Sequence, residues 1–377
     1  MTAWTPQVFS PCPDYPAVLF GRVAARSAAF RGTSAAGGAP VLVGSAAGHD
    51  PERVAVGARG ELLERLGNVM AGREAEAAAE VVGTFAELRA RGLPVREPPS
   101  DARQLWVGGR TTRGAEVLVP AASVFLQHRP PAGCDPVPSA GSTGVAAHPD
   151  AASAVRHAAW EVLERDLVRR SWYGLADRAP EECPAGPPEP VAGFVRARGL
   201  EATAFLVPAP AGTACAVVCL HRPDGSGQAF GARCGPADTI PALVEKAAYE
   251  AVMVRWSMET AVARTTWAQW QGRTPPGTAV QHALWTYHDM QDSLRLWEVR
   301  EVREARGGVG AQGGGVRTDP LGVLAEHTGQ DVIIVETSGG PARDAGVRVV
   351  RVLAPGAFPL PSGDGLDHEI PLPHPFG

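Results

Sequence analysis

The sequence predicts a mixed α/β (α+β) fold in which strands pack against long helices. Short runs of apolar and β-branched residues alternate along the chain with longer stretches whose apolar residues recur at helical spacing. The 377 residues are 45% hydrophobic and 20% charged. This composition suits one large domain, or two closely packed ones, around a substantial core.

The expected strands are short and the expected helices are long. Strands are predicted over residues 41–44, 105–107, 117–119, 203–207, 215–220, 332–336 and 347–353. Helices are predicted over residues 51–70, 74–91, 150–173, 240–260 and 277–303. Asp50 and Asp150 stand where each would cap a helix, and Pro51 fits the first helical position after Asp50.

Glycine and proline make up 44 and 35 residues and gather in a few segments. These segments are residues 128–141, 177–193, 306–316 and 355–377. We expect long loops there, and long loops in a compact domain are usually functional or mobile.

Charge and hydropathy exclude several classes of function. The net charge is −5 and no basic stripe is present, so nucleic acid is not expected as the main partner. The first residues lack the pattern of a secretory signal, and no apolar run reaches the roughly 20 residues needed to cross a bilayer. We therefore expect a cytoplasmic protein with no membrane segment. Cys215 and Cys219 share one strand face and are expected to be buried free thiols, since no paired zinc spacing occurs.

One pentapeptide pattern, Glu-x-x-Glu-Arg, occurs twice in predicted helices, one hundred residues apart. The copies are Glu61, Glu64 and Arg65, and Glu161, Glu164 and Arg165. In each copy the charged side chains share one helix face, because they lie at i, i+3 and i+4. Two such helices could form an acidic surface for a magnesium nucleotide, since Mg²⁺ takes a few carboxylates together with phosphate oxygens. Each copy alone could equally be an ion pair on a solvated helix face.

A segment rich in Gly, Ala and Ser precedes each of these two helices, at residues 44–49 and 141–148. Backbone N–H groups in such segments can face phosphates, although the same composition often serves only the turn.

Taken in order, these motifs resemble the YcaO family. Residues 142–147 (STGVAA) followed by 158–166 (AAWEVLERD) resemble its central signature, and the first pentapeptide resembles its earlier Glu-x-x-Glu-Arg motif. Arg255 and Glu259 match its Arg-x-x-x-Glu motif, and the ending 371–377 (PLPHPFG) is similar to that of azoline-forming members. The resemblance implies an N-terminal extension at 1–40 and a YcaO-like ATP-binding catalytic domain at 41–377 with a Pro-rich tail, 355–377.

The resemblance further implies ATP and Mg²⁺ as cofactors and a cyclodehydratase that turns Cys, Ser or Thr of a precursor peptide into thiazoline or oxazoline. The expected metal ligands are Glu61, Glu64, Glu161, Glu164 and Glu259. The expected nucleotide-binding residues are Arg65, Arg165, Arg255 and His157, where the arginines contact phosphates or hold the carboxylates in place. The expected catalytic tail residues are Pro371, Pro373, Pro375 and the terminal carboxylate of Gly377. A separate leader-binding partner, E1-like or RRE-type, and a homodimer are also implied.

Several positions depart from the family pattern. Gly57, Ala146, Ser153 and His157 stand where the family has Ser, Ser, Glu and often Gln, and Met253 stands at a Gln-like position. These departures keep a second interpretation open, in which the chain is a non-catalytic scaffold that docks the precursor or supports an active paralogue. A thioamide- or amidine-forming enzyme is a third alternative, which the Pro-x-Pro-x-Pro ending disfavours.

Overall fold

A computed structural model describes residues 4–30, 40–98, 100–271, 279–289, 294 and 319–358. Its strands form three antiparallel sheets. The first has the order β1 (Gln7–Phe9), β2 (Leu19–Arg26), β3 (Val41–Gly48). The second has the order β11 (Ala229–Pro236), β10 (Thr213–His221), β9 (Glu201–Val207), β8 (Glu181–Glu182). The third has the order β4 (Val81–Gly83), β5 (Gln104–Thr111), β12 (Ile333–Glu336), β13 (Arg348–Leu353), β7 (Val145–His148), with β6 (Glu116–Pro120) paired to β5.

Three long helices join these sheets: α1 (Pro51–Ala78), α4 (Ala151–Trp172) and α6 (Ile240–Met258). The shorter helices are α2 (Phe85–Ala90), α3 (Ala121–Val124), α5 (Val191–Ala197), α7 (Ala261–Trp270), α8 (Ala279–His288), α10 (Pro320–Thr328), α11 (Gly340–Asp344) and the 3₁₀ turn η1 (Ala237–Thr239). Each of the first two long helices begins at an aspartate cap. Asp50 accepts hydrogen bonds from the N–H groups of Glu52 and Arg53, and Asp150 accepts one from Ser153.

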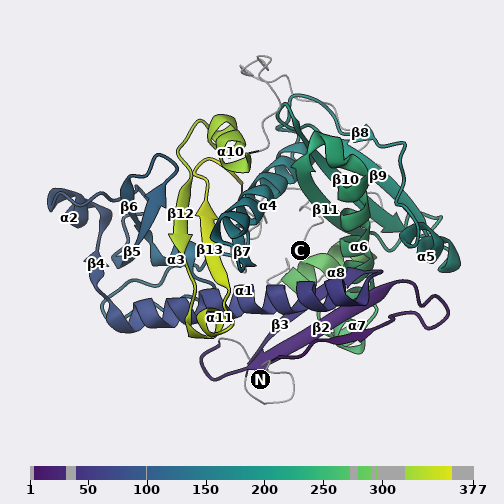
Figure 1. Cartoon of the computed structure of the whole chain (residues 1–377), viewed down its shortest axis with the longest axis horizontal. Helices are drawn as coiled ribbons and strands as arrows, with labels where there is room; N and C mark the ends of the chain where they lie inside the picture. Colours follow the sequence, from purple (N-terminus) through teal and green to yellow (C-terminus); the bar gives the residue numbers. More distant parts are fainter. Residues whose placement is uncertain are drawn as a thin grey trace.

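Each long helix follows an edge strand and packs against two sheets. α1 packs against β3 and β7, α4 against β7 and β11, and α6 against β11 and β3. In Figure 1, α1 runs below the six-stranded sheet and on to the β2–β3 hairpin, while α4 lies between β7 and β11. The three strand–helix units, β3–α1, β7–α4 and β11–α6, therefore close a ring, with each helix contacting the strand of the next unit.

Glycines allow each helix to lie directly on its own strand. A Cβ added at Gly44 would overlap the carbonyl oxygen of Ala58, and one added at Gly231 would overlap that of Ala247. At Gly144, which has a φ of +81°, an added Cβ would lie 2.6 Å from Cγ2 of Val162. Only glycine permits this close approach.

The predicted elements are largely confirmed, with one error. The α/β class, the strands, and the helices over 51–70, 150–173 and 240–260 all occur, and Cys215 and Cys219 are buried free thiols. The single helix predicted over 74–91 is wrong. Ala79 adopts a left-handed conformation with φ 44° that ends α1, and Val81 then pairs with Trp106 to form β4 before α2 begins. Strand pairing overrides the helical propensity of this Ala- and Glu-rich segment.

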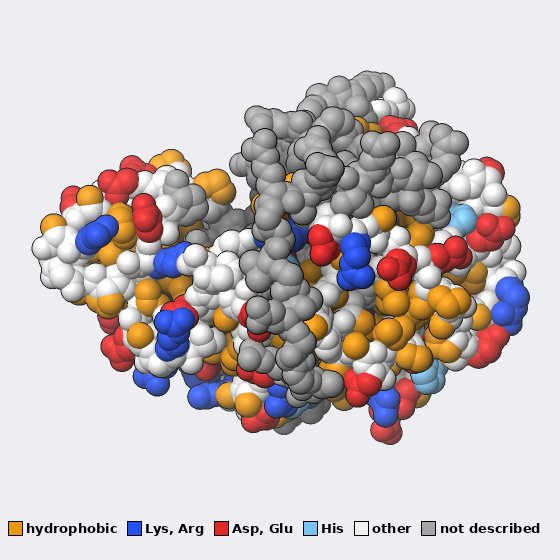
Figure 2. Space-filling view, turned by 90° about the horizontal axis from the view of Figure 1, so that it is seen from above, with side chains coloured by type: hydrophobic (Ala, Val, Ile, Leu, Met, Phe, Trp, Pro, Cys, Tyr) orange, Lys and Arg blue, Asp and Glu red, His pale blue; other side chains and the backbone are white. Residues whose placement is uncertain are grey.

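The helix predicted over 277–303 is present as α8, and most of its second half lies outside the described residues. None of the described helices is long and apolar enough to span a membrane. Figure 2 shows acidic and basic side chains interspersed with hydrophobic ones on the described part of one face.

Replacing Gly44 by Ala should lower the free energy of unfolding by roughly 2 kcal/mol or more, because the new methyl group must displace α1 from β3. Urea unfolding measures this loss. The control is Gly108→Ala on β5, where an added Cβ meets no atom within 4 Å. Equal stability of the two variants would contradict the close packing of α1 on β3.

Candidate functional site

One edge of each sheet faces the centre of the ring, because β3, β7 and β11 each end a sheet and each contacts two of the three long helices. An edge strand has backbone N–H groups without a strand partner, and burial makes an unpaired N–H costly. Helix carboxylates accept these hydrogen bonds. Glu61 accepts from the backbone N–H of Ser45 and from its hydroxyl at 3.2 Å. Glu161 accepts from Gly144 at 3.0 Å, directly before β7, and Glu250 accepts from Ala232 at 3.2 Å.

These three glutamates occupy the same place in each unit, three residues after an alanine that is fully buried. The alanine–glutamate pairs are Ala58 and Glu61, Ala158 and Glu161, and Ala247 and Glu250. The third copy lacks the following Glu-Arg, so the pentapeptide pattern missed Glu250. The signal that could have found it is the Ala-x-x-Glu spacing behind a strand glycine, here Gly231.

The next carboxylate position, one helical turn later, differs between the units. Glu164 of α4 is 2% exposed and accepts from the N–H of Cys234, on the strand of the next unit, at 3.0 Å. Met253 takes this position in α6 and packs in an apolar cluster with Ala47. Glu64 takes it in α1, and no described residue donates a hydrogen bond to it. Among the described residues, only the more distant charges of Arg65 and Arg351 therefore compensate the carboxylate of Glu64.

The two pentapeptide arginines hold carboxylates in place. Arg165 lies 3.4 Å from Glu164 and 3.3 Å from Glu250. Arg65 lies 2.5 Å from Glu61 and donates to the carbonyl oxygen of Val43 at 2.7 Å. Of the two roles predicted for these arginines, the contacts favour the positioning of carboxylates.

A buried arginine that the sequence did not reveal completes the centre. Arg351 of β13 is 4% exposed and donates from Nη1 to the carbonyl oxygen of Gly141 at 2.6 Å. Its Nε has no hydrogen-bond partner among the described residues. Burial lowers the pKa of Arg351 to about 10, although the charges of Glu161 and Glu64 partly oppose this shift. The guanidinium thus brings a poorly compensated positive charge to Glu64 and Glu161.

The carboxylates of the cluster are short of positive charge. Burial raises the pKa of Glu64 well above its ordinary value, and the charges of Glu161 and Glu61 raise it further. Burial also raises the pKa of Glu161, despite Arg165 and the N–H of Gly144. The pKa of Glu164 is raised to about 7, again mainly by burial. A divalent cation would relieve this repulsion, because it favours the ionised form of every carboxylate near it.

The donor set fits Mg²⁺ bound together with phosphate better than a metal held by protein alone. Among the described residues no group of three or more His, Cys, Asp or Glu side chains is arranged to hold a metal ion. The oxygens without a hydrogen bond or ion pair are those of Glu64 and one of Glu161, which come from two different helices. Mg²⁺ commonly binds one or two carboxylates and completes its shell with water and phosphate oxygens.

Arg255 and Glu259 form a separate polar group at the end of α6. Arg255 donates to the carbonyl oxygen of Gly227 and lies 3.5 Å from Glu259, and its guanidinium is 5.4 Å from the ring of Tyr287. The hydroxyl of Tyr287 donates to Glu259 at 3.0 Å. No hydrogen bond or ion pair between described residues links this group to the carboxylates of α1 and α4. Its part in nucleotide binding stays a prediction.

His157 and the altered positions lie nearer the start of the helices. The His157 ring packs edge-on against His148 with ring centroids 5.6 Å apart, and partial desolvation and the charge of Arg233 lower its pKa. Ser153 accepts from Arg156 at 2.8 Å. A Cβ added at Gly57 would lie 3.0 Å from that of Ala46, so a serine there would have to displace β3 slightly.

The tail residues Pro371, Pro373, Pro375 and Gly377 lie outside the described residues. The described beginning of the tail is anchored at Asp166, the fully buried residue that ends the central signature. Asp166 accepts from the N–H of Phe358 at 2.8 Å, from Arg170 at 2.7 Å and pairs with His327 at 2.6 Å. Although burial alone would raise it, these hydrogen bonds lower the pKa of Asp166. The charged aspartate therefore fixes the position of the Phe358 backbone, the last residue that the structure describes.

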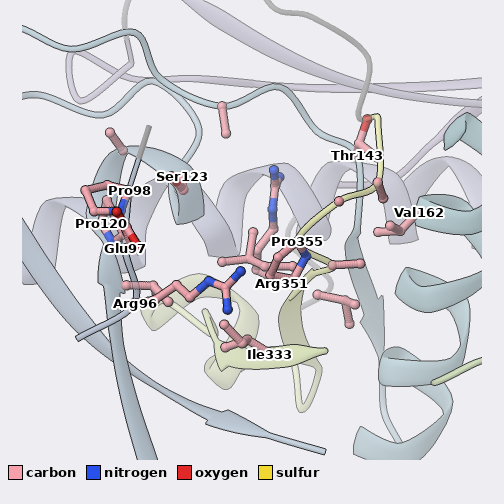
Figure 3. Close-up of a pocket in the computed structure, with 18 of the residues that line it drawn as sticks. Arg96, Glu97, Pro98, Pro120, Ser123, Thr143, Val162, Ile333, Arg351 and Pro355 are labelled. Atoms are coloured by element: carbon pink, nitrogen blue, oxygen red, sulfur yellow. The ribbon is translucent and has the colours of Figure 1, made fainter. Parts of the chain in front are cut away.

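Arg351, whose charge acts on Glu161 and Glu64, also lines a mainly apolar pocket of about 580 Å³, which Figure 3 shows. Thr143 and Val162, neighbours of Gly144 and Glu161, line one side of it, and Arg351 lines its floor. Arg96 reaches across the pocket toward Arg351, as Figure 3 shows. The site is therefore one continuous region, with a buried acidic cluster that suits Mg²⁺ and phosphate beside an apolar cavity. It defines a protein that can hold a metal-bound phosphate compound next to an organic ligand.

The chain belongs to the YcaO family. The family model described as YcaO cyclodehydratase, ATP- and Mg²⁺-binding, matches residues 45–358. ATP and Mg²⁺ are therefore the cofactors of the family, as expected from the sequence.

Solved structures share the fold at low sequence identity. The YcaO protein of Methanopyrus kandleri bound with AMPPCP and Mg²⁺ is 21% identical with a TM-score of 0.60, over 93% of this chain and 85% of that one. A heterocyclase in complex with substrate and cofactor is 16% identical with a TM-score of 0.67, over 98% of this chain but only 54% of that one. The Escherichia coli microcin synthetase McbBCD complex is 13% identical with a TM-score of 0.62, over 95% and 90%. A search of curated proteins found no match.

The raised pKa of Glu164 predicts how stability depends on pH. The folded protein keeps a proton on Glu164 up to about pH 7, whereas the unfolded chain releases it near its ordinary value of 4.5. The free energy of unfolding of the ligand-free protein should therefore fall as pH rises between these values, by at most about 1.4 kcal/mol per pH unit. Glu164→Gln keeps an acceptor for the N–H of Cys234 and should flatten this slope. Urea unfolding across this pH range measures both proteins, and identical slopes would refute the raised pKa.

Proposed function

We propose that the chain is an ATP- and Mg²⁺-dependent cyclodehydratase that activates a backbone amide of a ribosomally made precursor peptide. Its product would be thiazoline or oxazoline, formed from Cys, Ser or Thr. The observation that carries this proposal is the pair Glu64 and Glu161, half-buried residues on two helices whose carboxylates have a raised pKa, beside Arg351 and an apolar pocket.

Within this proposal the glutamates at the centre of the ring, which include Glu250 and not the separately placed Glu259, have two roles. Glu64 and Glu161 hold Mg²⁺, because their oxygens are the ones without a partner. Glu61, Glu164 and Glu250 accept from backbone N–H groups of the edge strands β3 and β11, as one oxygen of Glu161 does from Gly144 directly before β7. Arg65 and Arg165 fix the direction of these carboxylates, which sets the geometry of the metal-binding pair.

Bound ATP would supply the phosphoryl group that converts an amide oxygen into a good leaving group. In this reaction the Cys, Ser or Thr side chain adds to the preceding carbonyl, the resulting oxygen takes the γ-phosphoryl group, and phosphate leaves as the ring C=N bond forms. The chain's own contribution is positioning and charge neutralisation. Arg351 lies between the carboxylates and the pocket, so it can orient a group that reaches from one to the other.

The apolar pocket suits side chains of the precursor peptide. Its walls of Val162, Ile333 and Pro355 can bury apolar side chains, and Thr143 and Ser123 can bond the peptide backbone. Two distant structural relatives give this assignment indirect support, because one heterocyclase is in complex with substrate and cofactor and the microcin synthetase McbBCD complex has pro-MccB17 bound. We extend to this chain the use of a separate leader-binding partner, a homodimer, and the catalytic role of Pro371, Pro373, Pro375 and Gly377.

A non-catalytic scaffold is the second candidate. The observation that favours it is the change of nucleotide-motif positions, with Gly57 tightly packed against Ala46 and Ser153 engaged with Arg156. A scaffold would keep the fold but would not bind the nucleotide with a requirement for Mg²⁺.

Replacing Glu64 or Glu161 by Gln keeps the shape of the side chain and removes its charge. Each change should weaken Mg²⁺-dependent binding of AMPPCP by about 100-fold or more and abolish ATP turnover, because each removes one proposed metal ligand. Calorimetric titration with and without Mg²⁺ measures the binding. The control is Glu74→Gln, the same change on the same helix, where the carboxylate is exposed and pairs with Arg343.

Two results would count against the proposal. If wild-type protein binds AMPPCP and the Glu64→Gln and Glu161→Gln variants bind it equally well, the metal lies elsewhere. If the wild-type protein does not bind AMPPCP with Mg²⁺, the scaffold is the better function.

A further inference from the structure

Two exposed cations stand beside the acidic cluster without a carboxylate partner. Arg233 lies on the edge strand β11 and Lys246 on the second turn of α6. Neither forms a hydrogen bond or an ion pair with a described residue. The nearest acidic side chain in sequence to Lys246 is Glu245, which lies 3.3 Å from His49.

The repeated strand–helix unit places these two cations opposite each other. Arg233 follows Gly231 by two residues, as Ala46 follows Gly44, and Lys246 precedes Ala247 as Gly57 precedes Ala58. In the first unit the equivalent residues face each other closely, since a Cβ added at Gly57 would lie 3.0 Å from that of Ala46. Two like charges thus occupy a place that the same scaffold fills elsewhere with two small residues.

The positive charge of Arg233 acts on side chains of two helices, α4 and α6. The positive charge of Arg233 lowers the pKa of both Lys246 and His157, in addition to the larger effect of desolvation. Arg233 also favours the ionised forms of Glu161 and Glu164. Arg233 therefore lies within electrostatic reach of the carboxylates Glu161 and Glu164 and of Lys246 and His157.

Cations held together without counter-charge make an anion-binding surface, because their mutual repulsion is relieved when an anion binds. A single carboxylate or phosphate would reach one side of this arrangement. A polyphosphate can bind both parts of the site at once. One of its phosphate groups can contact Arg233 and Lys246, while another binds a metal held by Glu64 and Glu161.

We propose that Arg233 and Lys246, with His157 beside them, bind the polyphosphate of the nucleotide directly. This inference rests on the proposed function and adds to it the phosphate-binding residues of the third strand–helix unit. In this arrangement the phosphate charge is neutralised from two sides, by the metal on α1 and α4 and by side chains from β11 and α6.

Chemical modification of the wild-type protein tests this directly, because Lys246 is the only lysine in the sequence. An acylating reagent can then modify two amines, the ε-amine of Lys246 and the N-terminal α-amine, and peptide mass spectrometry separates them. Saturating tripolyphosphate or Mg²⁺–AMPPCP should slow acylation of Lys246 by about 10-fold or more and leave the α-amine unchanged. Adenosine should protect neither. Unchanged acylation of Lys246 under saturating Mg²⁺–AMPPCP would overturn the proposal.

Variants give the energetic test. Arg233→Gln and Lys246→Gln should each weaken the binding of tripolyphosphate and of Mg²⁺–AMPPCP by about 10- to 100-fold, the range for a lost charge-assisted hydrogen bond. Each should also make binding less sensitive to salt. The matched control is Arg113→Gln, an exposed arginine that pairs with Asp331 at 3.0 Å outside the cluster.

The failures of the two proposals can be told apart. Wild-type binding of Mg²⁺–AMPPCP that is unchanged in both variants overturns this inference and leaves the proposed function standing. Absence of wild-type binding overturns both. Losses in Arg113→Gln equal to those in the two test variants would mean that only the overall charge of the protein matters, and would also overturn the inference.

Discussion

The interaction on which the structure depends is the hydrogen bond between a helix carboxylate and the N–H of a buried sheet edge. Three sheets that meet edge to edge would leave unpaired donors in the interior, and burial makes such donors costly. Glu61, Glu161 and Glu250 accept from these edges at equivalent places in three strand–helix units. The same contacts bring negative charge into the centre. Arg65, Arg165 and Arg351 are then needed to hold that charge, and the fold and the site cannot be separated.

The candidate site lies where the three strand–helix units differ from one another. One turn beyond the first glutamates, Glu164 accepts from the next strand, Met253 is apolar, and Glu64 has no partner among the described residues. A fully regular ring would have all its carboxylates satisfied by the backbone. Because Glu64 accepts no hydrogen bond from a described residue, the centre keeps a carboxylate next to Glu161 that can bind a cation. The asymmetry between three similar units is thus what makes the centre able to accept a cation.

The sequence predicts the helices and the shared face of each pentapeptide, because both follow from local spacing. It cannot divide the glutamates by role, since whether Glu164 accepts from Cys234 depends on a strand seventy residues away. The sequence does not identify Arg351 as a site residue for the same reason. Its neighbours come from a loop and two helices that are far from it along the chain. Glu250 could have been predicted from the sequence, because its Ala-x-x-Glu spacing repeats that of the other two units. The helix predicted over 74–91 fails because pairing of Val81 with β5 outweighs local propensity.

The cost of Glu64 helps to choose between an enzyme and a scaffold. A half-buried carboxylate with a strongly raised pKa, and with no hydrogen bond from a described residue, lowers the stability of the ligand-free fold when it is ionised, because desolvation and the charges of Glu161 and Glu61 outweigh the attraction of Arg65 and Arg351. A glutamine or methionine at this position, like Met253 in the third unit, would serve a scaffold better. Arg351, buried with an unpaired Nε, poses the same problem with the opposite charge. Both costs are offset at once when a divalent cation and an anion occupy the centre together, which is the charge pattern of a metal-bound nucleotide.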